Sequence, residues 1–172
     1  MTNEIIDITD ENNKLLGVTS SMDAAHQRGL WHRTAHVWIY NSEVLLQLRK
    51  IPPAGVWDAS AAGHLRAGET PEQGALRESL EETGLSLKEL EFIGIRKTQT
   101  KRFGKINNEH AYVYLSRFEG SVEQLRPQKE EVHQLRFFPI NFLKKDIKAN
   151  PDKYVAHGSY WFEILDEIES RI

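Results

Sequence analysis

Residues 63–85 read GHLRAGETPEQGALRESLEETGL, a glycine-containing loop that leads into a predicted helix. Thr70 is a suitable N-cap, Pro71 favours the first helical position, and Gln73 completes a capping box. Gly84 stands where a left-handed residue commonly ends a helix. The sequence therefore predicts both ends of this helix.

Three carboxylates, those of Glu78, Glu81 and Glu82, fall within about one turn of the predicted helix. At about 100° per residue they share an arc of about 100°, which we expect to point outward. The residues that we expect to pack on the core lie on the opposite side: Leu76, Leu80 and Thr83. Like charges three and four apart each destabilise an isolated helix by about 0.2–0.5 kcal/mol. This arrangement favours a site for a hard divalent cation such as Mg²⁺ or Mn²⁺.

The alternative is an acid-rich surface helix that an Arg77–Glu81 pair stabilises in water. That interpretation requires the glycines of the loop, Glu69 and the carboxylate spacing to coincide by chance. We therefore favour the cation site.

The same stretch resembles the Nudix box, Gly-x5-Glu-x7-Arg-Glu-U-x-Glu-Glu-x-Gly-U, in which U is a bulky aliphatic residue. Eight positions match: Gly63, Glu69, Arg77, Glu78, Glu81, Glu82, Gly84 and Leu85. Ser79 departs from the pattern at the first U position. Because Ser79 lies at the edge of the apolar arc, we expect lost packing there and unchanged chemistry.

The resemblance implies an α/β (α+β) architecture, with a mixed β-sheet between helical layers in an α/β/α sandwich. Residue patterns alone predict only a mixed α/β protein. The resemblance also implies a single Nudix hydrolase domain over residues 1–172, with residues 1–33 forming an N-terminal hairpin and lead-in and residues 63–85 the box. The activity that it implies is Mg²⁺- or Mn²⁺-dependent pyrophosphohydrolysis of a nucleoside diphosphate derivative or a related organic diphosphate.

The resemblance also assigns roles to residues. Glu78, Glu81, Glu82 and the carbonyl of Gly63 would hold the metal, while Glu69 and Gly84 support the motif and Arg77 orients the carboxylates. The general base stays open between a box glutamate, Glu81 or Glu82, and an acid on a distant loop, Glu131. Three arginines are candidates for phosphate contact: Arg33, Arg49 and, within the basic loop 101–105, Arg102.

Several further stretches resemble type 1 isopentenyl-diphosphate isomerases and their Nudix relatives: 24–26, 30–33, 38–41 and 57–64. Those isomerases transfer protons with a cysteine where this chain has Ala62, and Asn107 replaces one of their acids. Alanine cannot transfer a proton, so isomerisation by that mechanism is disfavoured. His26, His32 and His64 form either a second metal site with Glu109 or an ordinary set of hydrogen-bonding histidines.

The rest of the sequence predicts a hairpin over residues 4–19 and strands over residues 35–40, 44–49, 90–99, 111–118 and 135–138. Two helices are expected near the end, one ending close to Asn150 and one over residues 159–172. The two are expected to pack on the sheet. No motif in the chain marks a particular substrate.

Composition restricts the function classes. The formal net charge of −3 gives no general attraction to nucleic acid or to an anionic membrane. Cysteine is absent, which excludes disulfides, thiolate ligands and cysteine nucleophiles. We expect a cytoplasmic protein that acts on a small-molecule diphosphate, with monomer and homodimer both open. A nucleotide-sensing module that has lost turnover is the remaining alternative.

Overall fold

The computed structural model describes residues 4–102 and 105–172. The described residues form nine strands: β1 (Ile5–Thr9), β2 (Leu15–Ser21), β3 (Trp31–Tyr40), β4 (Val44–Arg49), β5 (Trp57–Asp58), β6 (Ala61–His64), β7 (Glu91–Arg102), β8 (Lys105–Arg117) and β9 (Val132–Phe138). They also form four α-helices: α1 (Met22–Arg28), α2 (Pro71–Thr83), α3 (Ile140–Ala149) and α4 (Tyr160–Glu169). The predicted hairpin, the other predicted strands and the final two helices are confirmed.

The sheet is mixed. Strand β3 pairs antiparallel with β1, β4 and β6, and parallel with β8. Strand β7 pairs with β8, and β9 pairs with β4. This topology makes β3 the central element, and it places His32 beside Glu109 and Thr34 beside His64.

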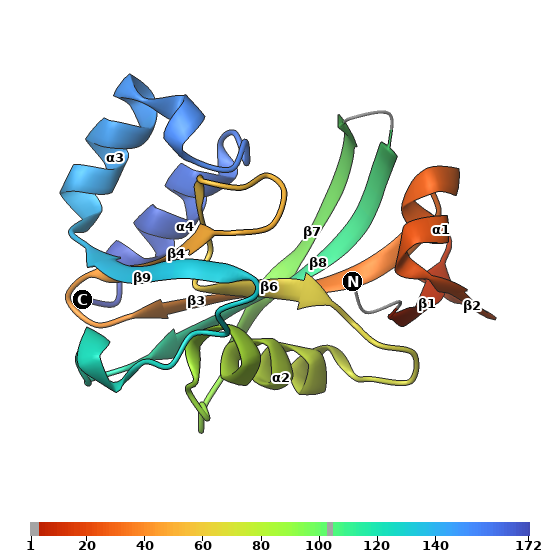
Figure 1. The fold of residues 1–172 in the computed structure, drawn as a ribbon, viewed down its shortest axis with the longest axis horizontal. Helices are drawn as coiled ribbons and strands as arrows, with labels where there is room; N and C mark the ends of the chain where they lie inside the picture. Colours follow the sequence, from red (N-terminus) through yellow and green to blue (C-terminus); the bar gives the residue numbers. More distant parts are fainter. Residues whose placement is uncertain (1–3, 103–104) are drawn as a thin grey trace.

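Helices cover both faces of the sheet, with α2 on one side and α3 and α4 on the other (Figure 1). Alternate residues of β3 serve the two faces because neighbouring side chains of a strand point in opposite directions. Trp38 packs with Trp161 of α4, whereas Val37 packs with Ala75 of α2. The predicted α/β/α sandwich is therefore confirmed.

Both predicted ends of α2 are confirmed. The Thr70 side chain accepts a hydrogen bond from the Gln73 amide, and the Gln73 side chain accepts one from the Thr70 amide. Gly84 ends the helix with a φ of 77°.

The predicted orientation of α2 is wrong in part. Glu78 and Glu82 are buried against the sheet, and Leu80 is 53% exposed. Ser79 was expected at the margin of the packed face, but it is fully buried and donates a hydrogen bond to the Ala75 carbonyl at 2.8 Å. The helix therefore packs through its small and acidic residues. Small neighbours on β6 make room for the carboxylates.

Three local predictions also need correction. Gly63 and His64 belong to strand β6, so the loop before α2 is shorter than predicted. Helix α1 was not predicted, and His26 lies in it and not in a loop. The basic segment 101–105 is not a loop throughout, because Lys101 and Arg102 continue β7 and Lys105 begins β8, while residues 103–104 lie outside the described residues.

Within the described residues, no helix combines the length and the apolar character that crossing a membrane requires.

Candidate active site

Strand β6 and helix α2 meet at Gly63. A Cβ built on Gly63 would lie 2.2 Å from the carboxyl carbon of Glu78. Glycine is therefore needed here because the Glu78 carboxylate occupies the space that any side chain would take. This contact places the Glu78 side chain directly against the strand backbone at Gly63, the residue whose carbonyl the resemblance suggested as a ligand.

Arg77 connects the acidic residues of the box. Its guanidinium donates to both carboxylate oxygens of Glu69, at 2.7 and 2.9 Å. It also donates to Glu78 at 2.7 Å, to Glu81 at 3.1 Å and to the carbonyl of His64 at 2.9 Å. Arg77 thus holds the loop, the strand and the helix in one arrangement, and Glu69 is part of that support. The Arg77–Glu81 pair, which the surface-helix alternative included, is present as one contact of this larger network.

Glu82 lies one turn further along α2 and reaches the same strand. One of its carboxylate oxygens accepts from the Ala62 amide at 2.8 Å and from the Gln47 side chain at 2.8 Å. Only 4% of Glu82 is exposed. Its position is therefore fixed by hydrogen bonds from β4 and β6.

Burial makes the charges on these two glutamates costly. Burial is the main reason that the pKa of Glu78 rises to about 7, with Arg77 opposing the rise. Burial, together with the Glu78 charge, raises the pKa of Glu82 to about 8. A divalent cation bound here would favour the ionised forms of both carboxylates.

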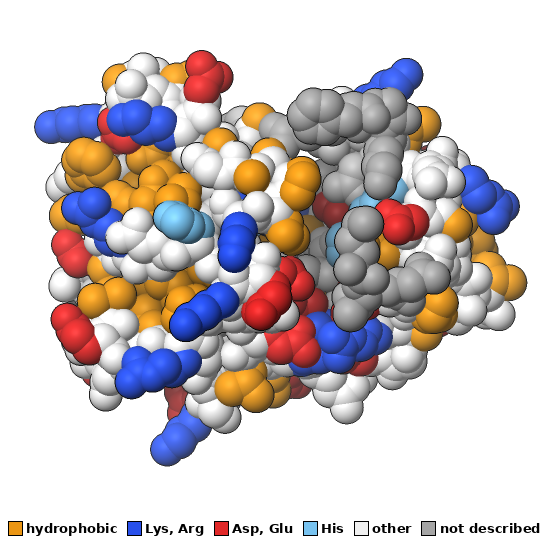
Figure 2. Space-filling view, viewed as in Figure 1, with side chains coloured by type: hydrophobic (Ala, Val, Ile, Leu, Met, Phe, Trp, Pro, Cys, Tyr) orange, Lys and Arg blue, Asp and Glu red, His pale blue; other side chains and the backbone are white. Residues whose placement is uncertain are grey.

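Glu81 and Glu131 lie at the more exposed side of this acidic cluster. The Glu81 side chain is 37% exposed and pairs with Arg66 and Arg77. Burial raises the pKa of Glu131, and the charges of Glu4 and Glu81 raise it further. The charges of Glu131 and Glu81 are therefore close enough to interact, and the role of Glu131 as a base stays a prediction. Acidic side chains also gather beside basic ones near the middle of the face in Figure 2.

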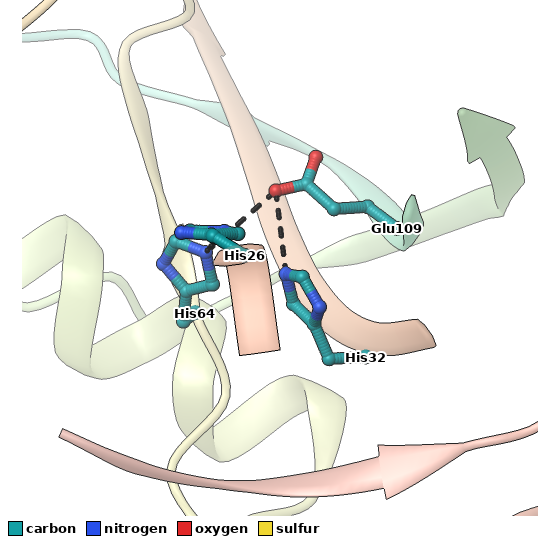
Figure 3. Close-up of side chains that lie close together, drawn as sticks. All are labelled: His26, His32, His64 and Glu109. Atoms are coloured by element: carbon teal, nitrogen blue, oxygen red, sulfur yellow. Dashed lines mark hydrogen bonds and ion pairs between the residues drawn. The ribbon is translucent and has the colours of Figure 1, made fainter. Parts of the chain in front are cut away.

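A second cluster contains His26, His32, His64 and Glu109 (Figure 3). One ligand atom from each residue lies within 4.8 Å of the others. The Nε2 atoms of His26 and His64 are 3.2 Å apart, and Glu109 Oε1 lies 3.7 Å from Nε2 of both His32 and His64. Burial lowers the pKa of His64 to about 3, which favours the neutral imidazole that metals bind. This donor set fits a transition metal ion with nitrogen and oxygen ligands.

The candidate phosphate-binding arginines have different surroundings. Arg33 donates to the side chain and the carbonyl of Asn13, both at 2.7 Å. Arg49 pairs with Asp58 at 2.8 Å. The side chain of Arg102 lies outside the described residues. The charge of Arg49 interacts with both clusters, because it lowers the pKa values of His64 and Glu82.

Sequence analysis missed the buried pair of Asp58 and His157, whose carboxylate and imidazole are 2.7 Å apart. These residues are 99 positions apart in the chain, so no local pattern connects them. The nearest signal was Asp58 itself, an acid between the hydrophobic residues Trp57 and Ala59.

A family model described as the NUDIX domain matches residues 30–158. The chain belongs to the Nudix family. It is 34% identical to Nudix hydrolase 3 of Arabidopsis thaliana, over 99% of this chain, but it spans only 24% of that protein's length. It is also 32% identical to an uncharacterised Nudix hydrolase of Clostridium acetobutylicum, over 92% of this chain and 81% of that protein. These relatives support a hydrolase.

Isomerases of the same superfamily are similar as well. An isopentenyl-diphosphate Δ-isomerase of Serratia proteamaculans is 32% identical over 92% of this Nudix chain and 87% of that protein. Among solved structures, DR0079 of Deinococcus radiodurans has a TM-score of 0.64 at 19% identity, covering 95% of this chain and 98% of that one. This structural likeness shows the shared fold.

Proposed function

We propose that this chain is a Mg²⁺- or Mn²⁺-dependent pyrophosphohydrolase that cleaves a phosphoric anhydride in a nucleoside diphosphate derivative or a related organic diphosphate. The observation that carries the proposal is the pair of buried carboxylates, Glu78 and Glu82, held against β6. Buried charges without a counter-charge are unfavourable, and Arg77 is already shared among three glutamates.

Glu78 and Glu82, with Glu81 and the Gly63 carbonyl, are the residues that would hold the metal. When bound, a divalent cation would offset phosphate charge and lower the pKa of an attacking water. Arg77 keeps the carboxylates of Glu78 and Glu81 aligned. Either a box glutamate or Glu131 takes the proton of the attacking water, and the raised pKa of Glu131 suits a base.

The isomerase alternative has less support from the residues present. Ala62 lies opposite His36 in the β3–β6 ladder, and its methyl group offers no proton to transfer. Asn107 contributes an amide where the isomerases have an acid. The box acids, in contrast, are complete.

A second proposal concerns the histidine cluster. We propose that His26, His32, His64 and Glu109 bind a transition metal ion such as Zn²⁺ or Mn²⁺, because four ligand atoms converge there. Metal content measured by mass spectrometry after dialysis against Zn²⁺ tests this directly. His64→Gln should remove the bound ion, while His133→Gln, at an exposed position of β9, should retain it. Equal metal content in both variants contradicts the proposal.

The hydrolase proposal is tested with a panel of nucleoside, sugar and prenyl diphosphates, followed by phosphate release and product mass. We expect cleavage of at least one class in the presence of Mg²⁺, and loss of cleavage after chelation. Binding of a nucleotide without turnover would favour the sensing module. Full activity after exhaustive chelation would contradict metal dependence.

A further inference from the structure

Asp58 is buried and contacts the guanidinium of Arg49 and the imidazole of His157. Its Oδ2 accepts from Arg49 Nη1 at 2.8 Å, and its Oδ1 lies 2.7 Å from His157 Nε2. Oδ1 also accepts from the amide of Ala59 at 2.8 Å. Asp58 is 4% exposed, so both side chains are held by a carboxylate that is itself fixed.

Part of the hydrogen-bonding capacity of the two side chains is unused in the described part of the chain. Within the described residues, His157 Nδ1 has no hydrogen-bond partner, and the His157 side chain is 18% exposed. Arg49 Nε is buried and likewise has no partner in the described part of the chain. Its Nη2 makes only a long contact, 3.3 Å, to the Pro52 carbonyl. The cluster therefore retains N–H groups of Arg49 beyond those that Asp58 uses, together with Nδ1 of His157, which donates only when the ring is protonated.

The segment before α4 is also held by bonds other than the Asp58–His157 contact. The Val155 amide donates to the Trp57 carbonyl at 2.9 Å, and Trp161 donates to the Val155 carbonyl at 2.8 Å. These bonds already attach residues 154–157 to β5 and α4. A buried Asp–His–Arg cluster is an expensive way to add a further attachment, since buried charges must be desolvated.

The cluster adjoins the candidate active site. The ring of His157 lies 5.7 Å from that of His36, which is the register partner of Ala62 on β6. Ala62 in turn bonds Glu82 through its amide. The charge of Arg49 also acts on Glu82, His64 and Glu131. The Arg49 end of the cluster therefore interacts electrostatically with groups proposed to bind metal, and the His157 end lies beside His36 of β3.

We propose that Arg49 and His157, both oriented by Asp58, form an anion subsite for the substrate phosphate that is not attacked. This inference rests on the proposed function, which supplies the diphosphate. Arg49 contributes guanidinium N–H groups, and His157 contributes Nδ1–H in its protonated form. Hydrogen bonds between charged donors and phosphate oxygens are among the stronger ones in proteins. His157 is thus a further substrate contact, and Asp58 is a positioning residue.

The test measures inorganic pyrophosphate binding to the full chain by calorimetry in metal-free buffer. His157→Asn retains an N–H donor for Asp58 but cannot carry a charge. We expect it to weaken pyrophosphate binding by at least about 10-fold, as loss of a charge-assisted hydrogen bond predicts. The matched control is His133→Asn, the same change at an exposed position of β9, which should bind like the wild type. Melting temperatures of all variants report on folding.

Two further readouts separate binding from a structural role. The His157 imidazole nitrogen signals in NMR spectra should shift when pyrophosphate is added to the wild type. With a cleavable diphosphate and Mg²⁺, His157→Asn should raise KM more than it lowers kcat. Unchanged pyrophosphate binding in His157→Asn, or a lower melting temperature with normal binding, would overturn the subsite. Since the binding assay contains no metal and no turnover, failure of hydrolysis is a separate result.

Discussion

Two buried glutamates, Glu78 and Glu82, carry the functional argument at the scale of single residues. We expect Glu78→Gln and Glu82→Gln each to lower kcat by at least about 100-fold, since each removes a proposed metal ligand. Because the amide is isosteric and uncharged, the free energy of unfolding without metal should be unchanged or higher. Glu72→Gln, an exposed position of the same helix, is the matched control.

Kinetics on a cleaved diphosphate, with denaturant unfolding in parallel, check this prediction. Near wild-type turnover in both variants would mean that the buried acids are not ligands.

Ser79 is packed more tightly than its place in the sequence predicted. The sequence predicted lost packing at the edge of the apolar arc, but the position is fully buried and its hydroxyl is bonded. We now expect Ser79→Leu to lower the free energy of unfolding by about 1–3 kcal/mol, through overpacking. Ser79→Ala should cost about 0.5–1.5 kcal/mol, the usual net value of one hydrogen bond. Urea unfolding distinguishes the two, and a gain from leucine would show that space remains.

Strand β6 matters at the scale of elements because its backbone lies against the carboxylates of α2. Gly63→Ala should lower kcat by more than about 10-fold, since the new methyl group must displace the Glu78 carboxylate. Gly55→Ala is not a suitable comparison because the φ of Gly55 is 76°. Ala62→Gly tests a neighbouring position without adding atoms. Normal activity of Gly63→Ala would show that the close contact has no catalytic role.

Helix α2 also predicts a pH dependence. The folded-state pKa values, about 7 for Glu78 and about 8 for Glu82, lie above the ordinary glutamate value of 4.5. Between pH 4.5 and 8 the folded protein holds protons that the unfolded chain releases, so metal-free stability should fall as pH rises through this window. Because Mg²⁺ binds the ionised carboxylates, its effect on melting temperature should be larger at about pH 8.5 than at about pH 6.

Thermal melts with and without Mg²⁺ at the two pH values provide the measurement. Glu82→Gln should flatten the metal-free pH dependence. An equal Mg²⁺ effect at both pH values would contradict the proposed ligands.

The same elements show what a sequence predicts and what it cannot. Thr70, Gln73 and Gly84 predicted both ends of α2, because capping depends on residues close in sequence. The inward direction of Glu78 could not be predicted, because its carboxylate on α2 occupies the space that a side chain at Gly63 of β6 would take. The short β6 had no alternating pattern of its own, and α1 has only seven residues. Asp58 and His157 meet only through the tertiary fold.

The fold of the whole chain is compatible with two reactions, hydrolysis of a diphosphate and isomerisation of a prenyl diphosphate. The chain resembles both hydrolases and isomerases, while Ala62 offers no transferable proton. We expect no detectable interconversion of isopentenyl and dimethylallyl diphosphate by the unmodified protein. NMR of the allylic product checks this. Isomerisation at a rate comparable to hydrolysis would overturn the proposed function.

The most direct test of the hydrolase proposal follows the oxygen atom of the attacking water. The protein is incubated in heavy-oxygen water with Mg²⁺ and each diphosphate of the panel, and the products are weighed by mass spectrometry. We predict one heavy oxygen in one phosphate-containing product of a cleaved substrate, with loss of that product after chelation or in Glu82→Gln. Cleavage that survives both changes, or no labelled product from any diphosphate, would contradict metal-dependent hydrolysis at Glu78 and Glu82.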